Sequence, residues 1–351
     1  MNVSNRPPGS VTLSCGLVLA LIAICGPLPR AFAESRVDLS RPVPAHGELF
    51  GATEISGSLA PGLFDRSFDY DPRPGSLGGS YWQLAAGLWA VYGVSEAVAL
   101  GLDFSPGGVI ISRYADEENR RRGRLSDLVL SARFELLGDD GLVGPGRRGR
   151  TPVELSVGPR IVLAMPAPDY ATALENRQAG ERYVAANQDL HAWGAGIGLD
   201  LALSPSPDLS LRTSHQLDIF LPAEYDSAGL SAYEENEIRR ALTGVEAFDT
   251  IWYRYRYRGA AGVDRRLSES WDLQPLTLEV DYLPPPIVDD LDPLSDTDSL
   301  LLRGGIGAEA RIPRREGKAP ILFRSAYYAP LLGKNRNAEH TLMLSLAFKL
   351  L

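Results

Sequence analysis

Residues 192–203, with the sequence AWGAGIGLDLAL, alternate between two kinds of side chain. The odd-numbered positions from Trp193 to Leu203 are all apolar, whereas the positions between them hold only alanine, glycine and Asp200. Successive side chains of a β-strand point to opposite faces of its sheet. This stretch therefore predicts a strand with one apolar face and one small or polar face, as in strands that separate lipid from the lumen of a transmembrane β-barrel.

The same alternation recurs along the chain. At its end, Leu342, Leu344 and Leu346 alternate with Thr341 and Ser345, and a helix would not space polar residues so evenly. The predicted strands are 47–57, 80–92, 96–105, 125–137, 152–165, 190–204, 208–220, 250–262, 271–282, 299–312, 320–329 and 339–350. We therefore predict an all-β fold, a transmembrane antiparallel up-and-down β-barrel of about twelve strands, an even number as in single-chain bacterial barrels.

The connections between the predicted strands alternate in length, as expected for short periplasmic turns and long external loops. The short set is 93–95, 204–207, 263–270 and 313–319, and the long set is 58–79, 106–124, 166–189, 221–249 and 283–298. Only 138–151 is longer than a periplasmic turn should be. Residues 233–248 have apolar side chains at helical spacing, which predicts a short helix in the longest loop, either covering the rim or folded into the mouth.

The N-terminus has the order of a secretory signal peptide. A polar start with Arg6 precedes an apolar run over 11–26, and Ala31 and Ala33 fit the signal-peptidase positions. Cleavage is expected before Glu34. The predicted organisation is a cleaved signal peptide over 1–33, a short periplasmic segment over 34–46 and an outer-membrane β-barrel over 47–351.

The composition excludes several function classes. Cys15 and Cys25 both lie in the predicted signal peptide, so the mature chain has no thiol for a disulfide, a metal site or a nucleophile. It retains 33 basic and 44 acidic residues, a net charge of −11 that argues against a nucleic-acid partner. The four histidines are scattered, and no catalytic triad, metal spacing or nucleotide fingerprint is recognisable. We expect no enzyme activity, no metal and no cofactor.

Residues 252–258, WYRYRYR, alternate aromatic and cationic side chains. Arginine is costly in the lipid, so Arg254, Arg256 and Arg258 are expected to point into the lumen. There they could attract an anionic solute, or they could pair with inward carboxylates and fill the barrel. The predicted pore-lining residues are Arg212, Arg254, Arg256, Arg258, Glu279, Asp281, Arg303, Glu309 and Arg324.

Aromatic residues recur near the ends of the predicted strands. They are Tyr81, Trp82, Tyr92, Trp193, Trp271, Tyr282, Tyr327 and Tyr328. Because tryptophan and tyrosine are enriched where a membrane meets water, this recurrence predicts interfacial girdles.

Three segments, 92–102, 123–134 and 155–160, resemble the outer-membrane family of transporters of the meta-pathway of phenol degradation. Tyr92 and Gly93 are similar to the turn that joins two strands in that family, and Gly123 to Asp127 is similar to its Gly-x-x-Asp-x-x-Leu strand start with one extra residue. The resemblance covers the middle third of the chain. It implies a role in the uptake of hydrophobic or aromatic compounds and identifies no binding residues.

The leading hypothesis is a passive channel or transporter of the outer membrane for small solutes, which could be hydrophobic, aromatic or anionic. The expected partners are outer-membrane lipid, the barrel-assembly machinery and a small-molecule solute. Two alternatives stay open. One is a structural or surface-exposed barrel whose lumen is closed by its own ion pairs, and the other is a secreted soluble β protein. The oligomeric state is left open.

Overall fold

The computed structural model describes residues 46–64, 67–71, 80–113, 120–122, 127–137, 153–164, 192–224, 250–288, 298–314, 320–334 and 336–350. The predicted signal peptide, the predicted helix over 233–248 and the connections 138–151 and 166–189 lie outside these residues. The barrel strands are β1 (Leu49–Ala60), β4 (Ser80–Ser95), β5 (Val98–Arg113), β7 (Leu128–Leu137), β8 (Val153–Leu163), β9 (Gly194–Ser206), β10 (Leu209–Phe220), β13 (Tyr255–Ser268), β14 (Trp271–Leu283), β16 (Ser299–Ile312), β17 (Ile321–Lys334) and β19 (His340–Lys349).

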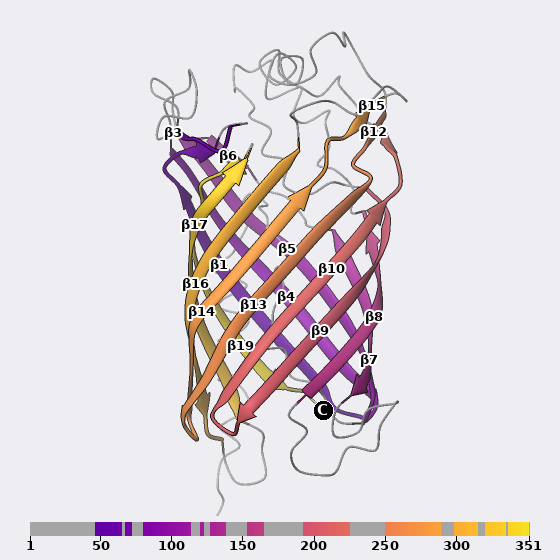
Figure 1. Ribbon diagram of the computed structural model, residues 1–351, viewed down its shortest axis with the longest axis vertical. Coiled ribbons are helices and arrows are strands. Elements are labelled where there is room, and N and C mark those ends of the chain that lie inside the picture. The colour runs from indigo at the N-terminus through magenta and orange to yellow at the C-terminus, as the bar shows by residue number, and fades with distance from the viewer. Residues whose placement is uncertain are drawn as a thin grey trace, which may run out of the picture.

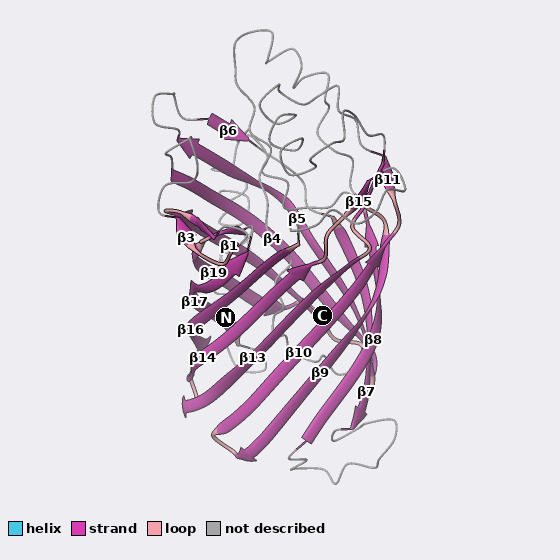
Figure 2. Ribbon diagram, turned by 45° about the horizontal axis from the view of Figure 1, so that its top comes forward, coloured by secondary structure: helices cyan, strands magenta, loops and turns pink. Residues whose placement is uncertain are grey.

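These twelve strands form a closed antiparallel barrel (Figures 1 and 2). Strands that follow one another in the list above pair with one another, and β1 pairs with β19 to close the ring. At this closure Ser58 on β1 and Thr341 on β19 are register partners, and their hydroxyl oxygens lie 2.9 Å apart. The predicted twelve-stranded up-and-down barrel is therefore confirmed.

In the described residues, seven short strands accompany the barrel. One, β6 (Arg120–Arg122), pairs with β5. The others form two three-stranded sheets: β2 (Leu63–Phe64), β3 (Tyr70–Asp71) and β18 (Arg336–Asn337), and β11 (Ala223–Glu224), β12 (Thr250–Trp252) and β15 (Ile287–Val288). Both sheets lie at the external end of the barrel, in the connections between barrel strands (Figure 1). No helix in the described part of the chain is long and apolar enough to cross a membrane.

Several strands, among them β4, β5 and β17, are longer than predicted, whereas β7, β8 and β9 are shorter, and three of the four short periplasmic turns are shorter than predicted. Gly93, predicted in a turn, pairs with Ala99, and the turn lies instead at Glu96 and Ala97. Likewise β13 runs through most of 263–270, and only Glu269 and Ser270 form the turn. The antiparallel ladder supplies partners for backbone N–H and C=O groups, so it continues until the chain must reverse. The predicted short turns are thus correct in kind but misplaced.

The predicted strand 271–282 contains a proline, Pro275, which does not end it. β14 passes through Pro275, and its register against β16 shifts between Gln274 and Thr277. Proline has no N–H to give to the ladder, so it is tolerated in a sheet where a bulge leaves a residue unpaired.

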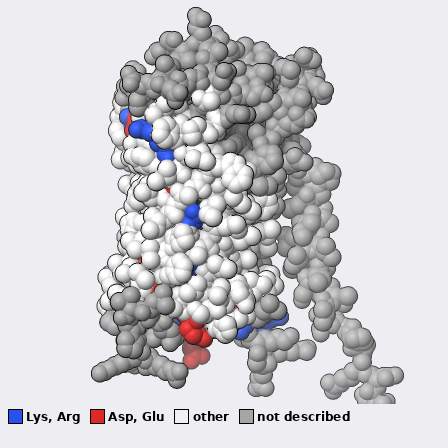
Figure 3. Space-filling view, turned by 90° about the vertical axis from the view of Figure 1, so that its right-hand side faces the viewer, with Lys and Arg blue, Asp and Glu red and all other residues white. Residues whose placement is uncertain are grey.

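Burial alternates along the strands as the sequence predicted. On β19, Leu342 is 52% exposed whereas its neighbour Thr341 is fully buried. The exposed positions of β9 include Ile197 and Leu199, and Trp193 just before the strand is exposed too; the alternation assigned all three to lipid. On the face of the barrel that Figure 3 shows, few charged side chains interrupt the described surface at mid-height, and the exposed side chains there include many large apolar ones. The outer surface is therefore an apolar belt.

The predicted girdles are only partly correct. Tyr92, Trp193, Trp271 and Tyr327 are exposed on the outer surface, but Tyr328 is 7% exposed and faces the lumen. Adjacent residues of one strand point to opposite faces, so Tyr327 and Tyr328 could not both reach the membrane interface. The side chains of Tyr81 and Trp82 lie outside the described part of the structure.

Candidate functional site in the barrel lumen

One side of the lumen is lined by charged side chains from β8, β10, β13, β14 and β16. Each is at most 8% exposed. We call this set the ionic wall, and it consists of Arg160, Asp218, Arg256, Arg258, Glu279, Asp281 and Arg303. Charges removed from water are costly unless they are paired with good geometry, so their partners decide whether the wall is stable.

The structure gives each member of the ionic wall an oppositely charged partner. Arg256 donates Nε and Nη2 to the two carboxylate oxygens of Asp281, at 2.8 and 2.6 Å. The Nη2 atom of Arg303 lies 3.1 Å from Oε2 of Glu279. The remaining carboxylate, Asp218, accepts hydrogen bonds from two arginines, Arg160 and Arg258. The interpretation of inward charges as paired groups that fill the barrel fits this geometry.

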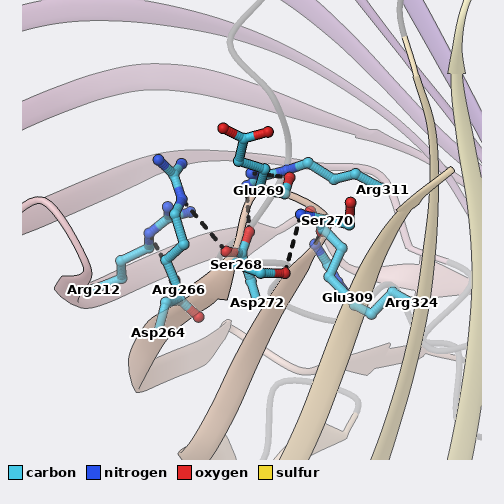
Figure 4. A network of polar contacts seen from close by, with 10 residues as sticks. All are labelled: Arg212, Asp264, Arg266, Ser268, Glu269, Ser270, Asp272, Glu309, Arg311 and Arg324. Carbon is cyan, nitrogen blue, oxygen red and sulfur yellow. Dashed lines mark hydrogen bonds and ion pairs between the residues drawn. The ribbon is translucent and has the colours of Figure 1, made fainter. Parts of the chain in front are cut away.

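A second group of charges lies near the turn between β13 and β14 (Figure 4). Here Arg212 Nε lies 2.8 Å from Asp264 Oδ2, and Arg324 Nη2 donates to Glu309 Oε2 at 2.8 Å. Arg311 pairs with Asp272 at the start of β14. The side chain of Arg212 is 36% exposed, unlike those of the ionic wall. This periplasmic network is therefore open to solvent in part.

The prediction that Arg254 lies on the same strand as Arg256 and Arg258 is wrong. The predicted strand 250–262 is broken at Tyr253 and Arg254, where Arg254 adopts φ = 61°, a left-handed conformation. The break arises because β12 leaves the barrel to pair with β11 and β15 in the rim sheet. Arg254 Nη2 there donates to the carbonyl oxygen of Pro285 at 3.0 Å. Only Arg256 and Arg258 remain on the lumen face of β13.

The opposite side of the lumen has different chemistry. In the strand order of the ring, β1 lies opposite β10 and β4 lies opposite β13. The buried inward residues of β1, β4, β5 and β19 are mostly apolar or carry hydroxyl groups, and we call them the apolar-hydroxyl wall: Ala52, Ser56, Ser58, Ala85, Trp89, Val91, Ala99, Thr341, Met343, Ser345 and Ala347. Asp103 on β5 and the half-buried Glu54 on β1 are its acidic members. The lumen is thus two-sided.

An apolar cluster lies where β7, β8 and β10 approach the external rim. Val129, Val162 and Phe220 are buried on the inward face of these strands and pack together with Ala192. This apolar cluster therefore lies between the ionic wall and the external ends of β8 and β10.

Sequence reasoning did not identify the apolar-hydroxyl wall as one surface, because in β4, at its centre, the two faces differ little in chemistry. In β4 the outward Leu84 and Leu88 alternate with the inward Ala85 and Trp89, so both faces are apolar and the periodic signal is weak. Arg160 and Asp218 were not among the predicted pore-lining residues, because no sequence pattern distinguishes them from other inward charges. Their contact with each other depends on the order of β8, β9 and β10 in the barrel, which no local sequence pattern gives.

No protein-family model matches this chain, and no curated protein matches it in sequence. Among solved structures, an outer membrane channel from Pseudomonas putida F1 superposes with a TM-score of 0.63 at 11% identity, over 90% of this chain and all of that one. The fold is that of an outer-membrane channel. Two further structures are more distant. A FadL homologue of Pseudomonas aeruginosa superposes with a TM-score of 0.38 at 13% identity, over 86% of this chain and 90% of that one. The monoaromatic hydrocarbon channel CymD superposes with a TM-score of 0.38 at 10% identity, over 87% of this chain and 88% of that one.

The apolar belt and this fold place the barrel in the outer membrane, and they confirm at the level of fold the barrel that the sequence resemblance implied. A soluble secreted protein would have to expose the whole belt to water, which soluble proteins avoid. Among the described residues no group of three or more histidine, cysteine or acidic side chains could hold a metal ion.

Proposed function

We propose that this protein is a passive outer-membrane channel for small solutes that combine an apolar part with a polar or anionic group. The observation that carries the proposal is the two-sided lumen, with the ionic wall opposite Trp89, Val91 and Met343. A solute passing between the walls could direct its polar group to the paired charges and its apolar part to the opposite side. The fold shared with the Pseudomonas putida channel supports passage through the barrel.

The predicted pore-lining residues enter this proposal with changed roles. Arg256, Arg258, Glu279, Asp281 and Arg303 form most of the ionic wall. Arg212, Glu309 and Arg324 belong to the periplasmic network, where a solute would leave the barrel. Arg254 places its positive charge at the external rim, next to the carbonyl oxygen of Pro285. Fixed charges along such a path set ion selectivity, and no step requires catalysis by the chain.

The second candidate is a structural barrel closed by its own side chains. It is favoured by the low exposure of the ionic wall, at most 8% for each residue. In both cases we expect insertion by the barrel-assembly machinery and contact with outer-membrane lipid.

Liposome swelling separates the two candidates. Vesicles containing the protein are placed in isotonic sodium benzoate, which has an apolar ring and a carboxylate, or in arabinose, a polar solute of similar size. The channel proposal predicts swelling in benzoate that is faster than in arabinose and faster than in empty vesicles. Equal swelling in both solutes would contradict the solute class, and no swelling in either would favour the closed barrel.

A further inference from the structure

Asp218 is the carboxylate of the ionic wall that pairs with two arginines. Its side chain is fully buried and it receives guanidinium groups from both sides. Arg160 Nε donates to Oδ1 at 3.1 Å, and Arg258 Nη2 donates to Oδ2 at 3.0 Å. Two positive charges thus share one negative charge.

The contact between Arg160 and Asp218 crosses a strand. Arg258 comes from β13, the neighbour of β10, but Arg160 comes from β8, and β9 lies between. Gly196 of β9 is the register partner of both Arg160 and Asp218. A Cβ atom at Gly196 would overlap Oδ1 of Asp218 and the carbonyl oxygen of Leu217. The absence of a side chain at this position is therefore what lets Arg160 reach Asp218 along the wall.

The next inward glycine of β9 is not constrained in this way. A Cβ atom at Gly198 would lie 3.7 Å from Cδ of Arg160 and 3.8 Å from the carbonyl oxygen of Gly158, ordinary contact distances. The aliphatic part of Arg160 therefore lies over Gly198 with room for a methyl group. Of the two glycines that flank the Arg160 side chain, Gly196 has the close fit, and it lies at the point where the ion pair crosses β9.

We propose that Asp218 determines the charge selectivity of the lumen by holding Arg160 and Arg258 against the barrel wall. Arginine has a long, flexible side chain whose charged end turns toward water when it is free to do so. Without the carboxylate, both guanidinium groups would repel each other and turn into the lumen, and the ionic wall would gain one positive charge. The selectivity role rests on the proposed channel function, whereas the hold on the two arginines does not.

The test compares Asp218→Asn with Asp103→Asn. Both variants remove one buried lumen carboxylate and keep the side-chain shape, but Asp103 lies on the apolar-hydroxyl wall. The first measurement is the reversal potential of the reconstituted protein under a KCl gradient. The second is the rate at which phenylglyoxal modifies Arg160 and Arg258, followed by peptide mass spectrometry, which needs no conduction.

Asp218→Asn should shift the reversal potential toward anions by more than Asp103→Asn does, and it should raise the modification rate of both arginines several-fold. Unchanged modification in folded Asp218→Asn would overturn the proposal, as would equal selectivity shifts in the two variants. If the native protein carries no current while Asp218→Asn still exposes the arginines, the channel function and the selectivity role both fail, and only the hold on the arginines stands.

Two further measurements cover the case in which Asp218→Asn does not fold. In the native protein, Arg160 and Arg258 should react with phenylglyoxal more slowly than Arg212, and equal rates would overturn the proposal. Gly196→Ala should release Arg160 whereas Gly198→Ala should not, so matching reactivity of Arg160 in these two variants would also contradict it.

Discussion

Arg256 on β13 and Asp281 on β14 form a two-point ion pair, with Nε and Nη2 of the arginine 2.8 and 2.6 Å from the two carboxylate oxygens. Both side chains are almost fully buried. Paired hydrogen bonds of this kind are among the strongest that side chains make, and they offset the cost of removing two charges from water. Each of the two charges therefore needs the other to offset the cost of its burial.

Replacing Asp281 by alanine should destabilise the barrel by about 3 kcal/mol, because it leaves the Arg256 charge buried without its carboxylate. The measurement is the urea dependence of the heat-modifiable folded band in lipid vesicles. The double variant Arg256→Leu and Asp281→Leu is the control and should recover most of the loss, since neither charge remains. A single variant as stable as the native protein would show that the pair contributes nothing.

Leu199, near the middle of β9, faces lipid, so Leu199→Arg should cost about 2–4 kcal/mol in folding stability measured in bilayers. Ala202 lies on the other face of the same strand, and Ala202→Arg should cost much less because its side chain points into the lumen. Equal losses for the two variants would be inconsistent with the assigned faces of the strand.

The closure of the barrel can be tested by a disulfide. The hydroxyl oxygens of Ser58 and Thr341 are 2.9 Å apart across the β1–β19 pairing, close enough for a disulfide between cysteines at these positions. The sequence has no cysteine beyond Cys25. Ser58→Cys with Thr341→Cys should therefore oxidise within one chain and change its mobility on a non-reducing denaturing gel. The pair Ser58→Cys and Ser345→Cys, which is out of register, should remain reduced.

Arg258 and Arg254 should differ in their influence on ion selectivity. Arg258→Gln removes a positive charge from the ionic wall and should shift the reversal potential toward cations. Arg254→Gln should have a smaller effect, because Arg254 lies outside the barrel strands and binds the Pro285 carbonyl oxygen. A larger shift of the reversal potential for Arg254→Gln would mean that the external rim, not the ionic wall, determines ion selectivity.

The sequence predicted the strands well where lipid and lumen impose opposite chemistry on alternate residues. In β9 and β19 the contrast between leucine and small or polar residues was sufficient. It could not locate the turns, because backbone pairing extends β4 and β13 past Gly93 and Val263, where the side chains no longer need to divide lipid from lumen.

The lumen was harder to predict than the strands. Inward arginines and carboxylates could be recognised from the alternation, but their pairing follows from the register of strands that are distant in sequence. The contact of Arg160 with Asp218 joins strands that are not neighbours and depends on the missing side chain of Gly196. The break at Arg254 likewise follows from competition between the barrel and the rim sheet, which no local pattern records.

The central claim is that solutes pass through this barrel, and single-channel recording in planar bilayers tests it most directly. Purified folded protein should produce discrete, reproducible current steps in KCl that are absent when heat-denatured protein is added. Stable insertion of folded protein with no current steps at any applied voltage would contradict the claim and identify the molecule as a barrel closed by its own ion pairs.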